Sequence, residues 1–223
     1  EEAERILEEA SEAETLGVAV FRRTAEALPL FAGEARIGGV ALCFGEKEIY
    51  CIPEEKMEIA ELLEKLEKLS AGPKTLSVFH LKETMKYFTP SVKDNCFDGI
   101  IAAYLLNPLK NDYEFEDVAR EQLGLMIDDK ADEWTKSCYE AYTAYAASEN
   151  LMEKLKEEQM DRLFLEIEMP LVFTLFDMEQ AGVRIEAEEL KKYGEQLGEQ
   201  IVQLESEIYE MAGENFNINS PKQ

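Results

Sequence analysis

The chain has 223 residues, of which 46% are apolar, which is enough for one large domain or for a medium domain with an appendage. Its formal net charge of −25, from 48 acidic and 23 basic side chains, repels the phosphate backbone of nucleic acids. Composition therefore argues against strong DNA binding by this chain alone, and apolar runs such as GIIAAYLL are too short to span a bilayer.

The cysteines are widely spaced, and none belongs to a Cys-x-x-Cys pair. Since no secretory signal is recognisable, we expect reduced thiols and a cytoplasmic protein without a membrane partner. His80 is the single histidine, so a structural zinc site is not expected. The four cysteines are Cys43, Cys51, Cys96 and Cys138.

Strand signals dominate the first quarter of the chain, after an acidic, helix-favouring stretch at residues 1–15. Three short segments rich in Val and Ile are each bounded by Gly or Pro: LGVAVF (16–21), RIGGVALCF (36–44) and EIYCIP (48–53). These segments predict three strands that form an antiparallel meander.

Helix and strand signals then alternate. The stretch 54–69 carries apolar residues at helical spacing and is followed by Ala-Gly-Pro, which predicts a helix that ends there. KTLSVF (74–79) predicts a fourth strand. Helical segments are expected at about 81–88, 98–106 and 113–123. This order predicts an α/β domain with a mixed sheet, which we place at residues 1–160.

Residues 161–223 are predicted to be helical throughout. Within 161–182, Pro170 is expected to kink a helix or to begin a new one, and Gly182 to end it. The stretch 186–212 places apolar residues at intervals of three and four, as in a coiled-coil seam. Such a seam packs either on the first domain or on an antiparallel helix that would follow this chain. The seam residues are Leu190, Tyr193, Leu197, Ile201, Leu204, Ile208 and Met211.

Three stretches of the C-terminal third carry a specific resemblance: EIEMPL (166–171), MEQAGVRI (178–185) and IYEMAGENFNINSPKQ (208–223). They resemble bacterial DNA polymerase I of family A, at the junction between its 3′–5′ exonuclease-like domain and the polymerase thumb. The resemblance implies that residues 161–223 are a helical junction and the first part of the thumb. It also implies that the palm and fingers, which would follow the Ser-Pro turn, lie outside this chain.

The resemblance continues upstream and covers nearly the whole chain. FDGIIAAYLLNPLKNDYEFEDVAREQLGL (97–125) is similar to a family stretch that begins with Phe-Asp, and AYAASENLMEKL (144–155) to the helix that holds the third exonuclease motif. The implied fold is ribonuclease H-like, with a mixed sheet and flanking helices. The implied parent is a DNA-directed DNA polymerase of replication and repair, which uses Mg²⁺ and binds a DNA primer–template.

An exonuclease of this family holds two divalent ions with carboxylates that converge on one small volume. The first family motif, Asp-x-Glu at the end of the first strand, falls here on Phe21 and Arg23. The second, Asn-x-x-x-Asp, falls on His80 and Thr84. Neither motif keeps an acid. A shift of three residues in the first strand would bring Glu26 into the site.

The third family motif, Tyr-x-x-x-Asp on a late helix, keeps Tyr145 and places Glu149 where the family has Asp. One carboxylate of four therefore remains. Because three ligands are missing and Arg23 adds a positive charge, we predict a vestigial exonuclease-like domain that binds no metal or other cofactor and acts as a scaffold. His80 is interpreted as a packed or solvated imidazole, and Asp98 as a helix-start residue.

Two other functions are kept open. One is an active Mg²⁺-dependent exonuclease with a displaced set of acids, such as Glu26, Asp98 and Glu149. The other is a non-enzymatic acidic module whose seam holds a partner helix. Release of mononucleotides from single-stranded DNA distinguishes the first from a scaffold. The association state distinguishes the second, since a scaffold is expected to be a monomer.

Overall fold

The computed structural model describes residues 2–23, 36–110 and 113–220. The chain divides into two units between Met178 and Glu179. Across the described ranges, no helix combines the length and the apolar character needed to cross a membrane. Glu26, a member of the displaced acid set, lies outside the described residues. The assignment of residues 1–160 and 161–223 to different polymerase domains stays a prediction.

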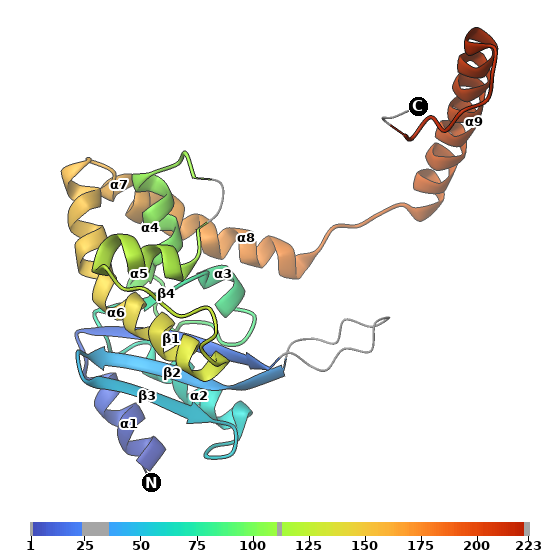
Figure 1. Cartoon of the computed structure of the whole chain (residues 1–223). Helices are drawn as coiled ribbons and strands as arrows, with labels where there is room; N and C mark the ends of the chain where they lie inside the picture. Colours follow the sequence, from blue (N-terminus) through green and yellow to red (C-terminus); the bar gives the residue numbers. More distant parts are fainter. Residues whose placement is uncertain (1, 24–35, 111–112, 221–223) are drawn as a thin grey trace. The chain divides into compact units, whose positions relative to one another are not determined.

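Five strands form one sheet in the first unit: Thr15–Arg23 (β1), Arg36–Gly45 (β2), Glu48–Pro53 (β3), Thr75–Val78 (β4) and Cys96–Asp98 (β5). Their order across the sheet is β3-β2-β1-β4-β5 (Figure 1). β1, β2 and β3 pair antiparallel, whereas β4 pairs parallel with both β1 and β5. The predicted meander and the predicted mixed α/β sheet are therefore confirmed.

The short strand β5 differs from the sequence-based prediction, which began a helix at residue 98. Its three residues pair with β4, with Leu76 opposite Cys96 and Val78 opposite Asp98. A segment of this length carries too little pattern to be recognised, because its strand character comes from pairing with a distant strand. The helix begins one residue later, at Gly99.

Helices cover both faces of the sheet. α1 and α2 pack on one face, whereas α6 crosses β1 and β2 on the other (Figure 1). The helices of this part of the chain are Glu2–Ser11 (α1), Ile59–Leu69 (α2), Leu81–Thr84 (α3), Gly99–Leu106 (α4), Phe115–Leu123 (α5), Glu133–Glu157 (α6), Asp161–Leu163 (α7), the π-helical turn Phe164–Glu168 (η1) and Met169–Ala181 (α8).

Two predicted helices are shorter in the structure. The helix predicted after β3 begins only at Ile59, because a turn closed by the Lys56 N–H and the Pro53 carbonyl (2.9 Å) separates it from the strand. The helix predicted at 81–88 is reduced to α3, Leu81–Thr84. In both places a turn precedes or follows the regular helix, and periodicity alone does not distinguish such turns from helix.

Small residues let α6 approach the sheet closely. Ala19, Ala41 and Cys43 of β1 and β2 form a buried cluster with Ala141 of α6. A Cβ atom at Gly17 would lie only 2.1 Å from the Ala141 carbonyl oxygen. The backbone of α6 therefore occupies the space that any side chain at Gly17 would need.

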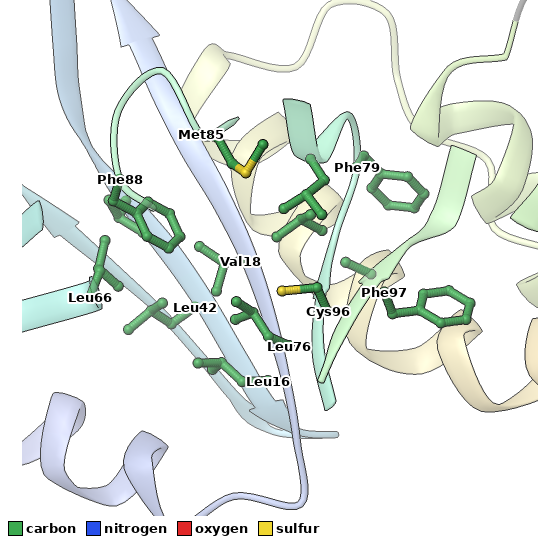
Figure 2. Packing of buried hydrophobic residues seen from close by; sticks show 14 of the residues in the cluster. Leu16, Val18, Leu42, Leu66, Leu76, Phe79, Met85, Phe88, Cys96 and Phe97 are labelled. Carbon is green, nitrogen blue, oxygen red and sulfur yellow. The ribbon is translucent and has the colours of Figure 1, made fainter. Parts of the chain in front are cut away.

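Larger apolar side chains fill the opposite face of β1, since successive residues of a strand point to opposite faces. Figure 2 shows this core between the sheet and the segments that follow α2 and β4. Its buried members include Leu16, Val18, Leu42, Leu66, Leu76, Phe79, Met85 and Phe88. Between Leu16 and Ala19, β1 is thus buried on both faces.

Pro170 lies in the first turn of α8, directly after the π-helical turn. The helical backbone runs without a break from Asp161 to Ala181, so Pro170 does not begin a new helix, and the π-helical turn directly before it is the irregularity expected of a proline inside a helix. Gly182 follows the end of α8 with a φ of 70°, as predicted for a helix stop.

The second unit contains α9, Ala187–Ala212, which ends at Gly213 in the left-handed conformation. After this end, the Tyr209 hydroxyl donates to the Phe216 carbonyl (3.0 Å). The predicted seam lies along α9, and its side chains are exposed at Leu190 (61%) and Ile201 (55%). Ile208, near the end of α9, is half-buried, whereas the seam from Leu190 to Leu204 is largely exposed in the described part of this unit.

Candidate functional site

A charged pocket of about 320 Å³ lies where β1 and β4 end and α3 begins. In an α/β sheet, the carboxyl ends of parallel strands are the usual place for a site. Its walls come from β1, from the segment after β4, and from the beginnings of α5 and α6. The charged lining residues are Arg22, His80, Lys136, Glu114, Glu116, Glu133 and Glu140.

His80 has a left-handed backbone, with φ 55° and ψ 59°, directly before α3. Such a conformation is uncommon outside glycine. Its Nε2 lies 4.0 Å from Oε2 of Glu114, and both side chains are well exposed. His80 thus lies at the pocket rim with its imidazole exposed to solvent.

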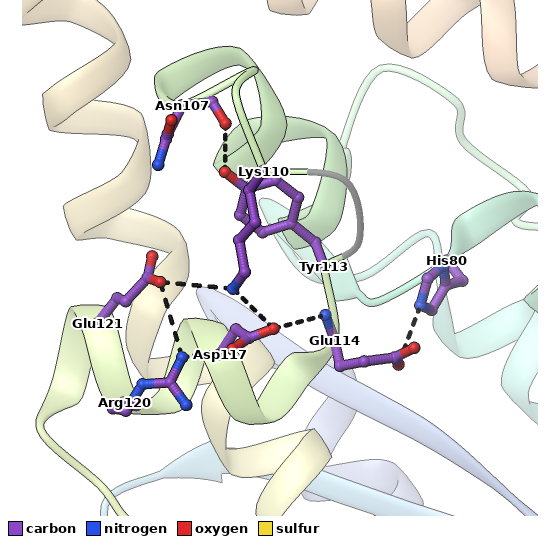
Figure 3. Close-up of polar contacts among 8 residues, drawn as sticks. All are labelled: His80, Asn107, Lys110, Tyr113, Glu114, Asp117, Arg120 and Glu121. Carbon is purple, nitrogen blue, oxygen red and sulfur yellow. Dashed lines mark hydrogen bonds and ion pairs between the residues drawn. The ribbon is translucent and has the colours of Figure 1, made fainter.

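The beginning of α5 holds Glu114 over this pocket through a capping box (Figure 3). The Glu114 N–H donates to Oδ2 of Asp117 (3.3 Å), and Lys110 Nζ lies 2.7 Å from the same oxygen. Arg120 pairs with the other oxygen of Asp117. The beginning of α5, which positions Glu114 at the pocket, is therefore held by the ion pairs of Asp117.

Glu140 of α6 is half-buried in the pocket wall, and the sequence analysis did not single it out. Burial raises the pKa of its carboxyl to about 7, with smaller contributions from Glu116 and Glu114, while Arg22 acts in the opposite direction. This carboxyl can accept or release a proton near neutral pH. No sequence signal identifies it, because its burial follows from the path of α6 over β1.

The residues that the sequence analysis aligned with the first and second family motifs lie in or near this pocket, and none of them is a carboxylate that could bind a metal ion. Thr84 is buried at the end of α3 and lines the pocket. Phe21 is buried on β1 and stacks on Trp134 of α6, with ring centroids 3.9 Å apart. Arg23 is the last residue of β1, where its backbone pairs with that of Arg36. An aromatic stack therefore occupies the strand position that the family motif assigns to its first acid.

Tyr145 and Glu149 lie further along α6, away from this pocket. The backbone of Tyr145 packs against Gly17. Glu149 is exposed and lines a second pocket, of about 310 Å³, together with Thr15 and Thr75 at the amino-terminal ends of β1 and β4. Because β1 rises by about 3.3 Å per residue, the stretch from Thr15 to Phe21 spans roughly 20 Å. The structure does not bring Glu149 together with Phe21 and Thr84.

Asp98 caps α4, as expected for a helix-start residue. Its Oδ1 accepts from the N–H groups of Ile100 (2.9 Å) and Ile101 (3.4 Å), and its Oδ2 accepts from that of Leu81 (2.6 Å). Burial raises the pKa of this carboxyl, and these backbone hydrogen bonds act against the rise. Both oxygens are thus engaged with backbone donors, which leaves Asp98 poorly suited to bind a metal ion.

Among the residues that the structure describes, no group of three or more His, Cys, Asp and Glu side chains is arranged to hold a metal ion. Four glutamates line the charged pocket together with Arg22 and Lys136, but among the described residues no three acidic side chains converge on one point. A pair of divalent ions needs several converging oxygen donors. The donor set around Phe21 and Thr84 does not fit such a pair.

Comparison with known proteins gives a consistent result. The chain is 37% identical to DNA polymerase I of Geobacillus stearothermophilus in an alignment 142 positions long, which covers 57% of this chain and 16% of that protein. It is 26% identical to DNA polymerase I of Pseudomonas aeruginosa in an alignment 231 positions long, gaps included, which covers 89% of this chain and 25% of that protein. No family model matches the chain.

A solved structure shares the fold. It is described as the POL domain of Pol1 from M. smegmatis in complex with DNA primer–template and dNTP. The match has a TM-score of 0.76 at 22% identity and covers 97% of this chain and 37% of that one. Fold and sequence together define a segment related to bacterial DNA polymerases.

The chain is homologous to bacterial DNA polymerase I, and the resemblance described from the sequence is confirmed. The alignments extend over as much as 89% of the chain. The chain spans between about a sixth and a quarter of the length of the relatives named above.

Proposed function

We propose that the chain is the part of a DNA polymerase I that contains a ribonuclease H-like, 3′–5′ exonuclease-like domain and the first part of the thumb. The mixed α/β sheet, the homology and the solved Pol1 structure support this assignment. The parent would be a cytoplasmic, monomeric, DNA-directed DNA polymerase of replication and repair. It would use Mg²⁺ and bind a DNA primer–template through its polymerase domain.

The exonuclease-like domain is proposed to be catalytically inactive and to serve as a scaffold. The observation that carries this proposal is the separation of the inherited motif positions. The one remaining carboxylate, Glu149, lies at the amino-terminal ends of the strands, whereas Thr84 lies at the carboxyl-terminal ends and Phe21 packs on Trp134. Two-metal hydrolysis requires these groups within one small volume.

The lining of the charged pocket is mixed: Arg22 and Lys136 repel a divalent cation, whereas its four glutamates attract one. The proposal therefore rests on the positions of the motif residues and not on the charge of the pocket. The displaced set of acids is also poorly suited to bind metal, because both carboxylate oxygens of Asp98 already accept backbone hydrogen bonds.

A nuclease assay tests this proposal. The chain is incubated for hours with a 5′-labelled single-stranded oligonucleotide and Mg²⁺ or Mn²⁺, and we expect no shortening beyond that of a buffer control. The variant Glu149→Ala should behave identically. Shortening that copurifies with the chain and disappears in Glu149→Ala would establish the alternative, an exonuclease with rearranged carboxylates.

The exposed seam of α9 bears on the other alternative, an acidic interaction module. In the proposed polymerase the seam packs on a following thumb helix of the same parent, so the chain alone should be a monomer. Light scattering after size exclusion measures this. A stable dimer that disappears in the double variant Leu197→Glu/Ile201→Glu would instead favour an interaction module, because both side chains lie on the exposed seam.

A further inference from the structure

Two thiols from different parts of the chain meet beside α6. Cys51 lies on β3 and Cys138 on α6, 87 positions apart in sequence, and their Sγ atoms are 2.8 Å apart. Both residues are free cysteines and half-buried. The sulfur atoms would have to approach by only about 0.8 Å to reach the ~2.05 Å length of a disulfide bond.

Cys138 can be reached from solvent. It lines a mainly apolar pocket of about 480 Å³ together with Thr135, Tyr139 and Tyr142 of the same helix. The pocket is wide enough for a small neutral oxidant such as hydrogen peroxide. Cys138 is therefore both accessible and in contact with a second thiol, which is the usual arrangement of a redox-active cysteine and its resolving partner.

The contact between the thiols also makes them chemically unequal. The hydrogen bond with Cys51 lowers the pKa of Cys138, although burial and the carboxylate of Asp132 act against it. The same hydrogen bond, together with burial, raises the pKa of Cys51. Cys138 lines the accessible pocket and Cys51 does not, so Cys138 is the thiol that meets an oxidant first.

The other cysteines lack these properties. Burial raises the pKa of Cys43 to about 11, and its Sγ donates to the Gly45 carbonyl. Burial raises the pKa of Cys96 to about 12. Both stay protonated thiols at neutral pH, so they serve as internal controls for reactivity.

We propose that Cys138 and Cys51 form a peroxide-sensitive thiol pair, in which Cys138 is oxidised first and Cys51 resolves it to an intramolecular disulfide. The Cys138 thiolate attacks one oxygen of hydrogen peroxide, the O–O bond breaks, and sulfenic acid forms with release of hydroxide, which takes up a proton. Cys51 then attacks the Cys138 sulfur, the S–O bond breaks, and the departing hydroxide leaves as water with the Cys51 proton. Two thiols and one peroxide thus give one disulfide and two waters.

The disulfide would join β3 to α6 and close a long loop. Ser137 and Glu140, on the same stretch of α6 as Cys138, line the charged pocket. Oxidation would therefore fix one wall of that pocket to the sheet. The inference does not depend on the proposed function, since it uses only the thiol geometry.

Peptide mapping tests the proposal on the folded native chain. After a molar excess of hydrogen peroxide and alkylation of the remaining thiols, we expect a peptide pair linked through Cys51 and Cys138 that is two hydrogens lighter than the separate peptides. Cys43 and Cys96 should be recovered alkylated once the chain is unfolded. In Cys51→Ser, dimedone should trap sulfenic acid on Cys138.

A matched control variant is Cys96→Ala, which should still form the linked peptide. The oxidised native chain should melt roughly 5–10 °C above its reduced form, and this gain should vanish in Cys138→Ser. Recovery of both thiols unmodified from the peroxide-treated folded chain would overturn the proposal, and so would a link that forms only after denaturation. Recovery of unmodified thiols is measured on the native chain, so the proposal can be tested even if a variant fails to fold.

Discussion

Two pockets lie at opposite ends of β1, and each contains only some of the groups that a nuclease would need in one site. The carboxyl-terminal pocket holds Arg22, Thr84 and the half-buried Glu140. The amino-terminal pocket holds the exposed Glu149, which the sequence resemblance aligns with the acid of the third family motif. One pocket thus has a suitable position in the fold without the inherited acid, and the other has the acid without the position.

A sequence motif and a suitable pocket can therefore lie apart on one helix. α6 lines both pockets, and Glu149 follows Glu140 by nine positions. At 1.5 Å per residue, that corresponds to about 14 Å along the helix. The positions of both pockets depend on how α6 packs on the sheet. The substitutions below change either that packing or one of the two pockets.

The largest effect is expected for Gly17→Ala, which disturbs both pockets. The added Cβ would lie 2.1 Å from the Ala141 carbonyl oxygen and 2.7 Å from the Tyr145 nitrogen, so α6 must move. We expect the free energy of unfolding to fall by about 4 kcal/mol, measured by urea denaturation. The control is Gly45→Ala, where the nearest atom is the flexible end of Glu48, with an expected loss below about 1 kcal/mol.

Phe21→Ala should disturb mainly the carboxyl-terminal pocket. The side chain is buried and stacks on Trp134, so its removal leaves a cavity between β1 and α6. We expect a loss of about 3 kcal/mol in the free energy of unfolding. Leu109→Ala, at a position that is 92% exposed, should change it by less than about 0.5 kcal/mol. Equal losses in the two variants would contradict the packing role of Phe21.

The strand meander and the mixed sheet could be predicted from the sequence, because Val- and Ile-rich segments bounded by Gly or Pro signal strands locally. The three-residue strand β5 could not, since its pairing partner β4 is distant in the sequence. The beginning of α2 was also missed, because a turn carried residues that fit the helical period. In both places the hydrophobic pattern of the sequence does not distinguish the observed backbone conformation from the predicted one.

The candidate site was harder to predict. Phe21, Thr84 and Glu149 could be singled out by resemblance, but their separation depends on how α6 crosses β1. Glu140 carries no motif, and its raised pKa arises from burial that appears only in the fold. The structural role of Asp98 was predicted correctly, because a carboxylate directly before an apolar helix is a local signal.

Asp98→Ala tests whether this acid is structural. The substitution removes the acceptor for three backbone N–H groups at a buried position, so we expect a loss of about 2–3 kcal/mol. Asp132→Ala removes an exposed cap of α6 that accepts from the Thr135 N–H (3.0 Å), with an expected loss of about 1 kcal/mol. Thermal unfolding compares the two, and a loss at Asp98 no greater than at Asp132 would argue against the buried cap.

The smallest effect, and the most direct comparison of the two pockets, is expected for Glu140→Gln and Glu149→Gln as a function of pH. Burial raises the pKa of Glu140 from its ordinary value of 4.5 to about 7, so ionisation is less favourable in the folded chain than in the unfolded one. Below about pH 4.5 the group is protonated in both states. As the pH rises from 4.5 to 7, the unfolded chain ionises first, and Glu140 destabilises the fold increasingly.

Glu140→Gln removes this titration, so the variant should gain stability relative to the native chain as the pH rises through that window. Because the side chain is only half-buried, we expect the difference to level off above pH 7 at about 1–2 kcal/mol. Among the charged neighbours, Arg22 lowers this pKa, and Glu116 and Glu114 raise it, while Lys136, His80 and Glu133 line the same pocket. Glu149→Gln, at an exposed position in the other pocket, should stay within about 0.5 kcal/mol of the native chain throughout. Urea denaturation at pH 4.5, 6 and 8 measures both, and parallel pH profiles for the two variants would show that the pockets do not differ electrostatically.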